Sequence, residues 1–466
     1  MVSNGVEYLK KQITEHASRF FKHPAEEWLS SNIVHFLPYK KAVSIREPII
    51  AIPVDIPVPA IPQEPYQVSF NGTSLTLWNR MAPPDSGNWE AIPDENSPLW
   101  YQHKSGTLIP AWNIFGNLFG LLTFAEERSI AHRDKHGRFS AFHSPRLNMN
   151  LLEVPAFNEA VAALVGACKG LHHNGRPQLN TTGLLKQPVV VLSHDCDILR
   201  GNDFWTQLIR CFRVLWPLAK LKPPNFANIW WAIRNMFIPR EFYFDNLSGM
   251  IDLEQSFGYV SSLYLLNGQG GRFGARSGSV LLPAMVKGIP NGWDIGMHYN
   301  YDTMLNRKSF EKQYSELNEI IPGRILAGRA HYLRFDPEKS FKFLQSYGIK
   351  VDESAGFADR IGYRCGIAGC FQVYDSASDQ TLDIWELPMT IMDSTLANQY
   401  NKDAIKEFGR LLTHLKCVGG AISVVFHPGQ FFNPEHKNML GLYHKILIEC
   451  RQHGAVSKSA CTLIQM

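Results

Sequence analysis

The sequence predicts an α/β protein whose larger part, residues 183–466, is a (β/α) barrel. From residue 187 onward, short apolar, β-branched runs alternate with longer amphipathic stretches about seven times. Repeated strand-then-helix units imply parallel strands joined by right-handed crossovers, and about seven units suffice to close a barrel. Residues 1–182 lack this alternation and mix helix-like with strand-like segments. They predict an additional N-terminal α+β domain.

Local patterns predict the elements of the N-terminal part. Apolar residues share one face over residues 5–31, which is typical of an amphipathic helix. The proline-rich segment 46–65 favours an extended connector or an edge strand, because proline cannot donate a hydrogen bond inside a sheet. Beyond it we expect strands at 66–70 and 74–78 and helices at 114–128 and 155–173.

The same patterns give the elements of the barrel in order. Strands are predicted at 187–193, 258–265, 293–298, 325–331, 349–354, 383–389 and 421–427. Helices are predicted at 202–217, 225–237, 303–319, 337–347, 395–417 and 436–452.

Composition excludes several classes of partner. A net charge of +4, with lysine and arginine dispersed along the chain, is too mild to indicate a nucleic-acid partner or an anionic membrane. The eight cysteines form no CxxC pair and are expected to be reduced thiols. No apolar run reaches the length of roughly 18 residues that a membrane span needs. We therefore expect a soluble, cytoplasmic protein.

Titratable residues end four of the predicted barrel strands. The carboxyl ends of all strands in a barrel meet at one mouth, so these side chains should surround a single cavity. Carboxylates and imidazoles together suit zinc or a similar first-row metal ion. The residues are Asp195 and Asp197 after the first strand, His298 and Asp302 after the third, Arg329 and His331 after the fourth, and His427 after the last.

The order of these segments resembles the polysaccharide deacetylase (NodB-homology) superfamily, which includes carbohydrate esterase family 4. The matching motifs are 193–197, 296–298, 328–332, 352–354 and 425–427, within a region of roughly 185–430. Phrases at 329–335, 362–366 and 135–139 resemble one subgroup, found in bacterial surface-polysaccharide gene clusters. The resemblance implies a distorted (β/α)7-type barrel and hydrolytic removal of an acetyl group from an N-acetylated sugar.

The resemblance also implies roles for the strand-end residues. Asp197 and His298 would bind one divalent metal ion, zinc, and the third ligand is either His331 or Asp302. Asp195 would act as the general base, held by Arg329, and His427 would protonate the leaving amine. The backbone N–H of Tyr332 is the candidate for stabilising the oxyanion. The chain departs from the family pattern because Cys196 separates the two aspartates, and Asp302 stands where a second metal-binding histidine is usual.

For several other positions, a purely structural role is weighed against a functional one. Arg364 binds substrate or forms a structural salt bridge, and the two are equally favoured. Arg272 belongs to the glycine-rich loop 267–274, which lacks the spacing of a dinucleotide or phosphate loop, and could meet an anionic substrate or only solvent. Asp393 is expected to cap a helix starting near Thr395, with orientation of His427 as the alternative. His194 should be packed away from Asp195 if the strand alternates.

These expectations combine into a metal-dependent carbohydrate N-deacetylase that acts during surface-polysaccharide biosynthesis. The substrate would be an acetylated sugar, in nucleotide-linked or lipid-linked form. An amidohydrolase acting on a non-sugar C–N bond is one alternative, and a catalytically inactive barrel that binds a sugar or a protein partner is another. The sequence predicts neither the sugar nor the oligomeric state.

Overall fold

The computed structural model describes the greater part of the chain. The described residues are 2–22, 34–42, 44–45, 49–58, 61–83, 88–181, 183–197, 242–267, 282–302, 306–400, 403–431 and 439–466, with single positions between 208 and 233. The helices predicted at 202–217 and 225–237 fall outside this part, apart from those single positions, and so does Arg272.

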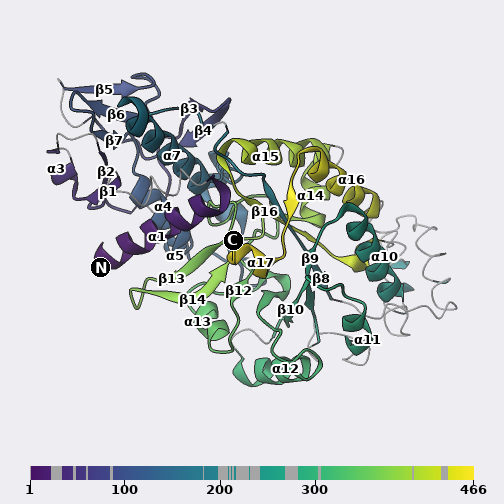
Figure 1. The fold of residues 1–466 in the computed structure, drawn as a ribbon. Coiled ribbons are helices and arrows are strands. Elements are labelled where there is room, and N and C mark those ends of the chain that lie inside the picture. Colours follow the sequence, from purple (N-terminus) through teal and green to yellow (C-terminus); the bar gives the residue numbers. More distant parts are fainter. Residues whose placement is uncertain are drawn as a thin grey trace.

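A distorted (β/α) barrel forms the larger part of the molecule (Figure 1). Its sheet has the order β13-β14-β12-β11-β10-β9-β8-β16-β15, with β17 paired to β8, and every neighbouring pair except β13–β14 is parallel. Each of the seven predicted strands overlaps an observed one. The strands are β8 (Val189–Cys196), β9 (Ser261–Leu265), β10 (Asp294–Tyr299), β11 (Ala327–Ala330), β12 (Val351–Asp352), β13 (Phe371–Asp375), β14 (Gln380–Glu386), β15 (Ile391–Met392), β16 (Ala421–Phe426) and β17 (Val456–Ser457).

The barrel is distorted because its sheet stops short of a full circle of strand pairing. Among the described residues, β13 and β15 form the two edges of the sheet. The irregular segment 353–370 makes hydrogen bonds near both sides of the gap. Gly362 N–H donates to Thr390 O (3.2 Å), Ala421 N–H donates to Ala368 O (3.1 Å), and Ala355 N–H donates to the Glu386 carboxylate (2.8 Å).

Helices follow most of the strands, as the alternating pattern predicts. Helix α12 begins after Asn306, whose side chain accepts a hydrogen bond from Ser309 N–H, and it buries Phe310, Gln313 and Leu317 on one face. The single helix predicted at 395–417 is two helices. The helices of this part are α10 (Phe242–Phe257), α11 (Leu282–Lys287), α12 (Arg307–Ile320), α13 (Ser340–Gln345), α14 (Asp393–Tyr400), α15 (Ala404–Val418), α16 (Met439–Gln452) and α17 (Ala460–Ile464).

The N-terminal part contains a second sheet, a hairpin and several helices. The sheet has the order β1-β2-β7-β6-β5 and the hairpin is β3–β4. Its elements are α1 (Val2–Phe20), β1 (Val34–Leu37), α3 (Tyr39–Ala42), β2 (Ile50–Pro53), β3 (Tyr66–Phe70), β4 (Thr73–Leu77), β5 (Trp89–Ile92), β6 (Trp100–His103), β7 (Leu108–Pro110), α4 (Ile114–Leu122), α5 (Ala125–Ser129), α6 (Pro145–Asn148) and α7 (Ala156–Asn174).

Three predictions for the N-terminal part need correction. The first helix ends at Phe20, Phe21 and Lys22 are not helical, and residues 23–31 of the predicted helix lie outside the described part. The helix predicted at 114–128 is broken at Phe124, whose φ of 58° is incompatible with a continuous helix. Strand β2, in the proline-rich segment, is flanked by β1 and β7 and is therefore not an edge strand. The prolines of this segment are tolerated because they fall at the end of β2 or beyond it, where they interrupt no hydrogen bonding within the strand.

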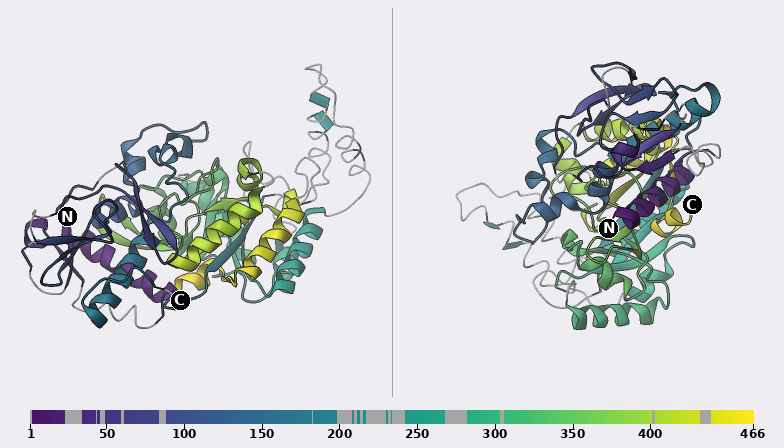
Figure 2. Two further views of the ribbon diagram at one scale, coloured as in Figure 1. Left: turned by 90° about the horizontal axis from the view of Figure 1, so that it is seen from above. Right: turned by 90° about the vertical axis from the view of Figure 1, so that its left-hand side faces the viewer.

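The two parts pack closely on each other, with the N-terminal elements to one side of the barrel (Figure 2). Tyr8 of α1 donates a hydrogen bond to Gln372 O of β13 (2.9 Å), and Asn158 of α7 donates to Gly419 O (2.6 Å). One continuous cluster of buried apolar residues runs through α1, α7 and the barrel strands. The boundary near residue 183 stays a prediction. Within the described residues, no helix is both long and apolar enough to cross a membrane.

Candidate active site

The carboxyl ends of strands within a run of five neighbouring parallel strands, β11-β10-β9-β8-β16, bring the predicted residues together. Register places His298 of β10 opposite Arg329 of β11, and Asp195 of β8 opposite Tyr264 of β9. Strand β16 lies on the other side of β8 and ends one residue before His427. Because parallel strands end at the same edge of a sheet, the side chains converge there. The residues that end these strands therefore lie together at the mouth of the barrel.

Asp197, His298 and His331 form a group that fits a metal ion. One ligand atom from each lies within 4.8 Å of the other two. The distance from Asp197 Oδ1 to His298 Nε2 is 3.1 Å, and to His331 Nε2 it is 3.7 Å. Among the described residues, the buried Asp197 Oδ1 accepts no hydrogen bond. A buried carboxylate oxygen without a donor is costly, and a bound cation would remove that cost.

The two histidines are prepared to act as ligands. His298 Nδ1 lies 2.9 Å from Arg329 O, which can only accept, so Nδ1 carries a proton and Nε2 is the ring nitrogen that faces Asp197. Burial lowers the pKa of His331 to about 4, which keeps its ring neutral at pH 7. Burial alone would raise the pKa of Asp197, but His331 and His298 outweigh burial and lower it. The donor set is therefore one carboxylate and two imidazoles.

Asp302, the alternative third ligand, lies apart from this group. It is an exposed residue of the turn after β10, and no helix forms at 301–302 that would return it towards His298. The structure thus brings His331, rather than Asp302, to the other two residues.

Asp195 is held by a buried network of charges. Arg329, which has no exposed surface, donates from Nη1 to Asp195 Oδ1 (2.5 Å) and from Nη2 to Glu353 Oε2 (2.7 Å) and Ser193 Oγ (2.6 Å). Its guanidinium also stacks on the Tyr264 ring at 4.8 Å. Burial would raise the pKa of Asp195, but Arg329 outweighs it and lowers the pKa. Asp195 is therefore an ionised carboxylate.

The other oxygen of Asp195 faces two histidines. Asp195 Oδ2 lies 3.8 Å from His298 Nε2 and 3.8 Å from His427 Nε2. His427 Nδ1 lies 3.0 Å from Asp393 Oδ2, and the same oxygen accepts a hydrogen bond from His427 N–H (2.8 Å). Burial would lower the pKa of His427, but Asp393 dominates and raises it to about 10. Asp393 therefore orients His427, which was the alternative to a capping role alone.

The remaining predicted residues lie in different surroundings. Tyr332 has a left-handed backbone and a 37% exposed side chain beside His331, with ring centroids 4.7 Å apart. Arg364 is buried in a two-pronged ion pair with Glu127 (2.6 and 2.7 Å), which is the structural alternative to substrate binding. His194 is fully buried against Glu254 (2.7 Å), as its position in the strand predicts.

Glu353 is the main residue that the sequence analysis left without a role. It accepts hydrogen bonds from Arg329, Ser423 and Tyr264 and has no exposed surface. Its position inside the motif 352–354, directly after a short buried strand, was the available signal.

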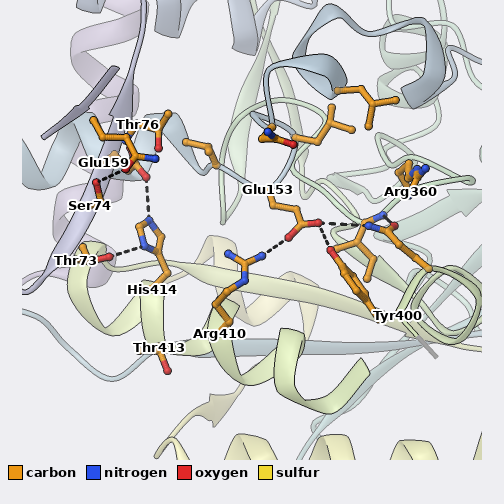
Figure 3. Close-up of a pocket in the computed structure, with 17 residues that line it drawn as sticks. Thr73, Ser74, Thr76, Glu153, Glu159, Arg360, Tyr400, Arg410, Thr413 and His414 are labelled. Atoms are coloured by element: carbon orange, nitrogen blue, oxygen red, sulfur yellow. Dashed lines mark hydrogen bonds and ion pairs between the residues drawn. The ribbon is translucent and has the colours of Figure 1, made fainter. Parts of the chain in front are cut away.

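A separate cavity of about 700 Å³ lies between the hairpin β3–β4 and helices α14 and α15 (Figure 3). Four of its charged side chains are paired with each other. His414 Nε2 lies 2.9 Å from Glu159 Oε1, and Arg410 and Tyr400 both donate to Glu153. These pairs join the N-terminal part to α14 and α15. Among the described residues, the group of three side chains that could hold a metal ion lies at the barrel mouth and not in this cavity, so the mouth is the candidate active site.

No protein-family model matches the sequence, and comparison with curated proteins gives no match. The solved structures to which the chain is similar include polysaccharide deacetylases and a family 4 carbohydrate esterase. A putative polysaccharide deacetylase from Mycobacterium smegmatis has a TM-score of 0.38 and 15% identity over 60% of this chain and 90% of that one. PuuE allantoinase has a TM-score of 0.37 and 12% identity over 59% and 89%.

The family 4 carbohydrate esterase from Streptomyces lividans has a TM-score of 0.30 and 10% identity, over 58% of this chain and 91% of that one. Similarity at this level carries no information about the reaction. A proposal about the reaction must therefore rest on the side chains at the barrel mouth.

Proposed function

We propose that the chain is a metal-dependent hydrolase that removes the acetyl group from an N-acetylated sugar. One observation carries the proposal. A group of one carboxylate and two imidazoles, Asp197, His298 and His331, lies beside an ionised carboxylate, Asp195, and a carboxylate-bound imidazole, His427. Hydrolysis of an amide needs an activated water, a proton acceptor and a proton donor, and this arrangement supplies a candidate for each.

Asp197, His298 and His331 would hold the metal ion, for which zinc is the proposed element because of the mixed oxygen and nitrogen donors. When bound there, the ion would polarise the acetamide carbonyl and lower the pKa of a water molecule. Arg329 O fixes the ring of His298 through Nδ1, which orients the ligand nitrogen.

Asp195 and His427 would transfer the protons. Arg329 keeps Asp195 ionised, so Asp195 can accept the proton of the attacking water as that water adds to the carbonyl carbon. Asp393 keeps His427 protonated, so His427 can give its proton to the nitrogen when the C–N bond breaks. The products are acetate and the free amine. Each proton-transfer group is expected to contribute about 10²–10⁴-fold to the rate.

The choice of a sugar substrate is supported by the five ordered motifs and by Tyr332. Its exposed ring beside His331 offers a flat apolar face, and such faces stack on the C–H face of a pyranose. We propose a nucleotide-linked or lipid-linked sugar of surface-polysaccharide biosynthesis, modified in the cytoplasm.

Metal analysis of purified wild type and four alanine variants tests the proposal. Wild type should carry about one ion per chain, and Asp197→Ala, His298→Ala and His331→Ala should lose it. Asp302→Ala is the matched control and should retain the ion. Loaded wild type should release acetate from N-acetylglucosamine oligomers or from UDP-N-acetylglucosamine. Wild type that stays metal-free after addition of zinc would contradict the proposal and favour an inactive binding barrel. Loaded protein that cleaves only non-sugar amides would move the function to the amidohydrolase alternative.

A further inference from the structure

A short turn of the N-terminal part reaches the loop that follows the candidate metal ligand His331. Arg138 donates from Nη1 to Tyr332 O (2.9 Å), although the two residues are 194 positions apart in the sequence. His136 Nδ1 lies 3.1 Å from the hydroxyl of Tyr301, at the end of the neighbouring strand. The N-terminal part therefore contacts two loops at the mouth of the barrel.

The loop that Arg138 contacts has an unfavourable backbone. Tyr332 has φ 60° and ψ 15°, and Leu333 also has a positive φ of 53°. Residues with a Cβ rarely adopt this left-handed region, and two in succession persist only when the surroundings hold them. Tyr332 is the residue whose backbone N–H is the proposed donor to the oxyanion, so its conformation matters for the reaction.

The surroundings of Tyr332 supply that support. Its ring packs against the rings of His136 and Tyr301, with centroids 5.0 and 5.5 Å away. Tyr301 is itself fixed by Arg334, which donates to Tyr301 O (2.7 Å) and lies over the ring at 4.7 Å. Arg138 differs from these ring contacts because it bonds to the backbone of Tyr332 itself, through the carbonyl oxygen.

Arg138 is held rigidly before it meets Tyr332. Its Nε and Nη2 both contact Asp134 Oδ2, at 2.8 and 2.7 Å. The other oxygen of Asp134 accepts hydrogen bonds from His136 N–H (2.8 Å) and Arg138 N–H (3.0 Å). This carboxylate closes the turn 134–138 and aims the guanidinium, because a side chain that is already ordered loses little entropy when it makes a further bond.

We propose that Arg138, supported by His136, is a positioning residue for Tyr332. It holds the left-handed backbone so that the Tyr332 N–H can serve the oxyanion, and the N-terminal part thereby completes the active site. The inference rests on the proposed function for its catalytic consequence. The structural part of the inference, that Arg138 holds the conformation of Tyr332, does not depend on the proposed function.

Three variants test the inference: Arg138→Ala, Arg138→Lys as the conservative replacement, and Lys135→Ala as the control in the same turn. Lys135 is an exposed residue of the same turn. In Arg138→Ala, amide hydrogen exchange over residues 331–335 should accelerate at least tenfold, and a crystal structure should show Tyr332 displaced from φ 60°. The kcat for acetate release should fall about 10–100-fold, which is less than the 10²–10³-fold loss of a whole oxyanion donor. Any rise in KM should be smaller than the fall in kcat, because the Tyr332 ring moves with its backbone, and metal content and melting temperature should match wild type.

Arg138→Lys should recover part of kcat, and Lys135→Ala should behave as wild type. Unchanged exchange and an undisplaced Tyr332 in Arg138→Ala would overturn the inference, as would a raised KM at constant kcat. A general loss of stability in both alanine variants would overturn it too, because it would show a structural role for the whole turn. If wild type itself releases no acetate, the proposed function fails, and hydrogen exchange still decides whether Arg138 holds Tyr332.

Discussion

Replacing Arg329 by methionine should destabilise the protein strongly at neutral pH and much less in mild acid. The guanidinium lies between two buried carboxylates, Asp195 at 2.5 Å and Glu353 at 2.7 Å. Methionine keeps roughly the length of the side chain and removes the charge and all its donors. Removing one partner of a buried ion pair typically costs about 3–5 kcal/mol, because the remaining charge is left without compensation.

The pH dependence of that cost follows from how each carboxylate can respond. Without Arg329, Asp195 and Glu353 can avoid a bare buried charge by binding a proton. From their ordinary pKa values of 3.8 and 4.5, protonation at pH 7 costs about 4 and about 3 kcal/mol. At pH 5 the same protonation costs about 2 and about 1 kcal/mol. We therefore expect Arg329→Met to lose about 4 kcal/mol at pH 7 and at least 2 kcal/mol less at pH 5.

Linkage between proton binding and folding decides whether the cost of Arg329→Met rises or falls with pH. Burial already raises the pKa of Glu353, and losing Arg329 would raise it further above the unfolded value. A group with a raised folded-state pKa stabilises the fold below its unfolded pKa, and that stabilisation is lost as pH rises through the folded pKa. The loss of unfolding free energy in Arg329→Met must therefore be larger at pH 7 than at pH 5.

Urea unfolding of wild type, Arg329→Met, Glu353→Gln and the double variant at both pH values measures this. The double variant should be less destabilised than Arg329→Met at pH 7, because one of the two uncompensated charges is gone. Arg307→Met is the control, since Arg307 pairs with Glu311 on an exposed helix face and its loss should change little. A cost in Arg329→Met that is equal at pH 5 and pH 7, or below about 1 kcal/mol at pH 7, would refute the reasoning.

Two further predictions concern His427 and His16. Asp393→Asn should lower kcat at least tenfold and leave the metal content unchanged, because it removes the charge that holds the proposed proton donor His427 in its protonated form; unaltered kcat would exclude that role. Burial, with Arg19, lowers the pKa of His16 to about 3, so the stabilisation from its neutral form is complete above about pH 6.5 and is lost as pH falls towards 3. When pH falls from 7.5 to 5, the unfolding free energy of His16→Phe should therefore drop about 2 kcal/mol less than that of wild type in urea titrations. The exposed His173→Phe serves as the control, and equal losses in wild type and His16→Phe would contradict the prediction.

The strand ends of the barrel could be predicted because both signals are local. Runs such as 187–193 and 421–427 are β-branched and apolar, and parallel topology follows from the alternation of strands with helices. Once the strands are parallel, Asp195, His298 and His427 must meet at one edge. No distance in space had to be known for that step.

Which residue joins Asp197 and His298 could not be predicted, because it depends on the conformation of short turns. His331 lies in a 3-10 turn with a left-handed Tyr332, whereas Asp302 lies in an exposed turn after β10. Neither conformation follows from residue preference, since tyrosine disfavours positive φ. The pairing of Arg364 with Glu127 was equally hidden, because the partner lies 237 positions away.

The role of the N-terminal part emerges only from contacts of this long-range kind. The barrel sheet leaves a gap between β13 and β15, and the segment 353–370 that lies there has little regular structure to hold it. Glu127 holds it through Arg364, and Arg146 holds it by donating to the carbonyls of Tyr363 (3.1 Å) and Arg364 (2.7 Å). Glu126 in turn pairs with Arg146 at 2.8 Å, so all these charges are buried and matched.

Such pairs are costly to break but add little stability over an apolar core, so their value here is geometric. These ion pairs fix the position of the irregular segment 353–370. In a closed barrel, a strand in this gap would be fixed by its hydrogen bonds to neighbouring strands instead. The segment begins at Glu353, the partner of Arg329, so its placement also sets the network that keeps Asp195 ionised. The N-terminal part therefore acts on the site from two directions: through segment 353–370 onto the proposed base, and through Arg138 onto Tyr332.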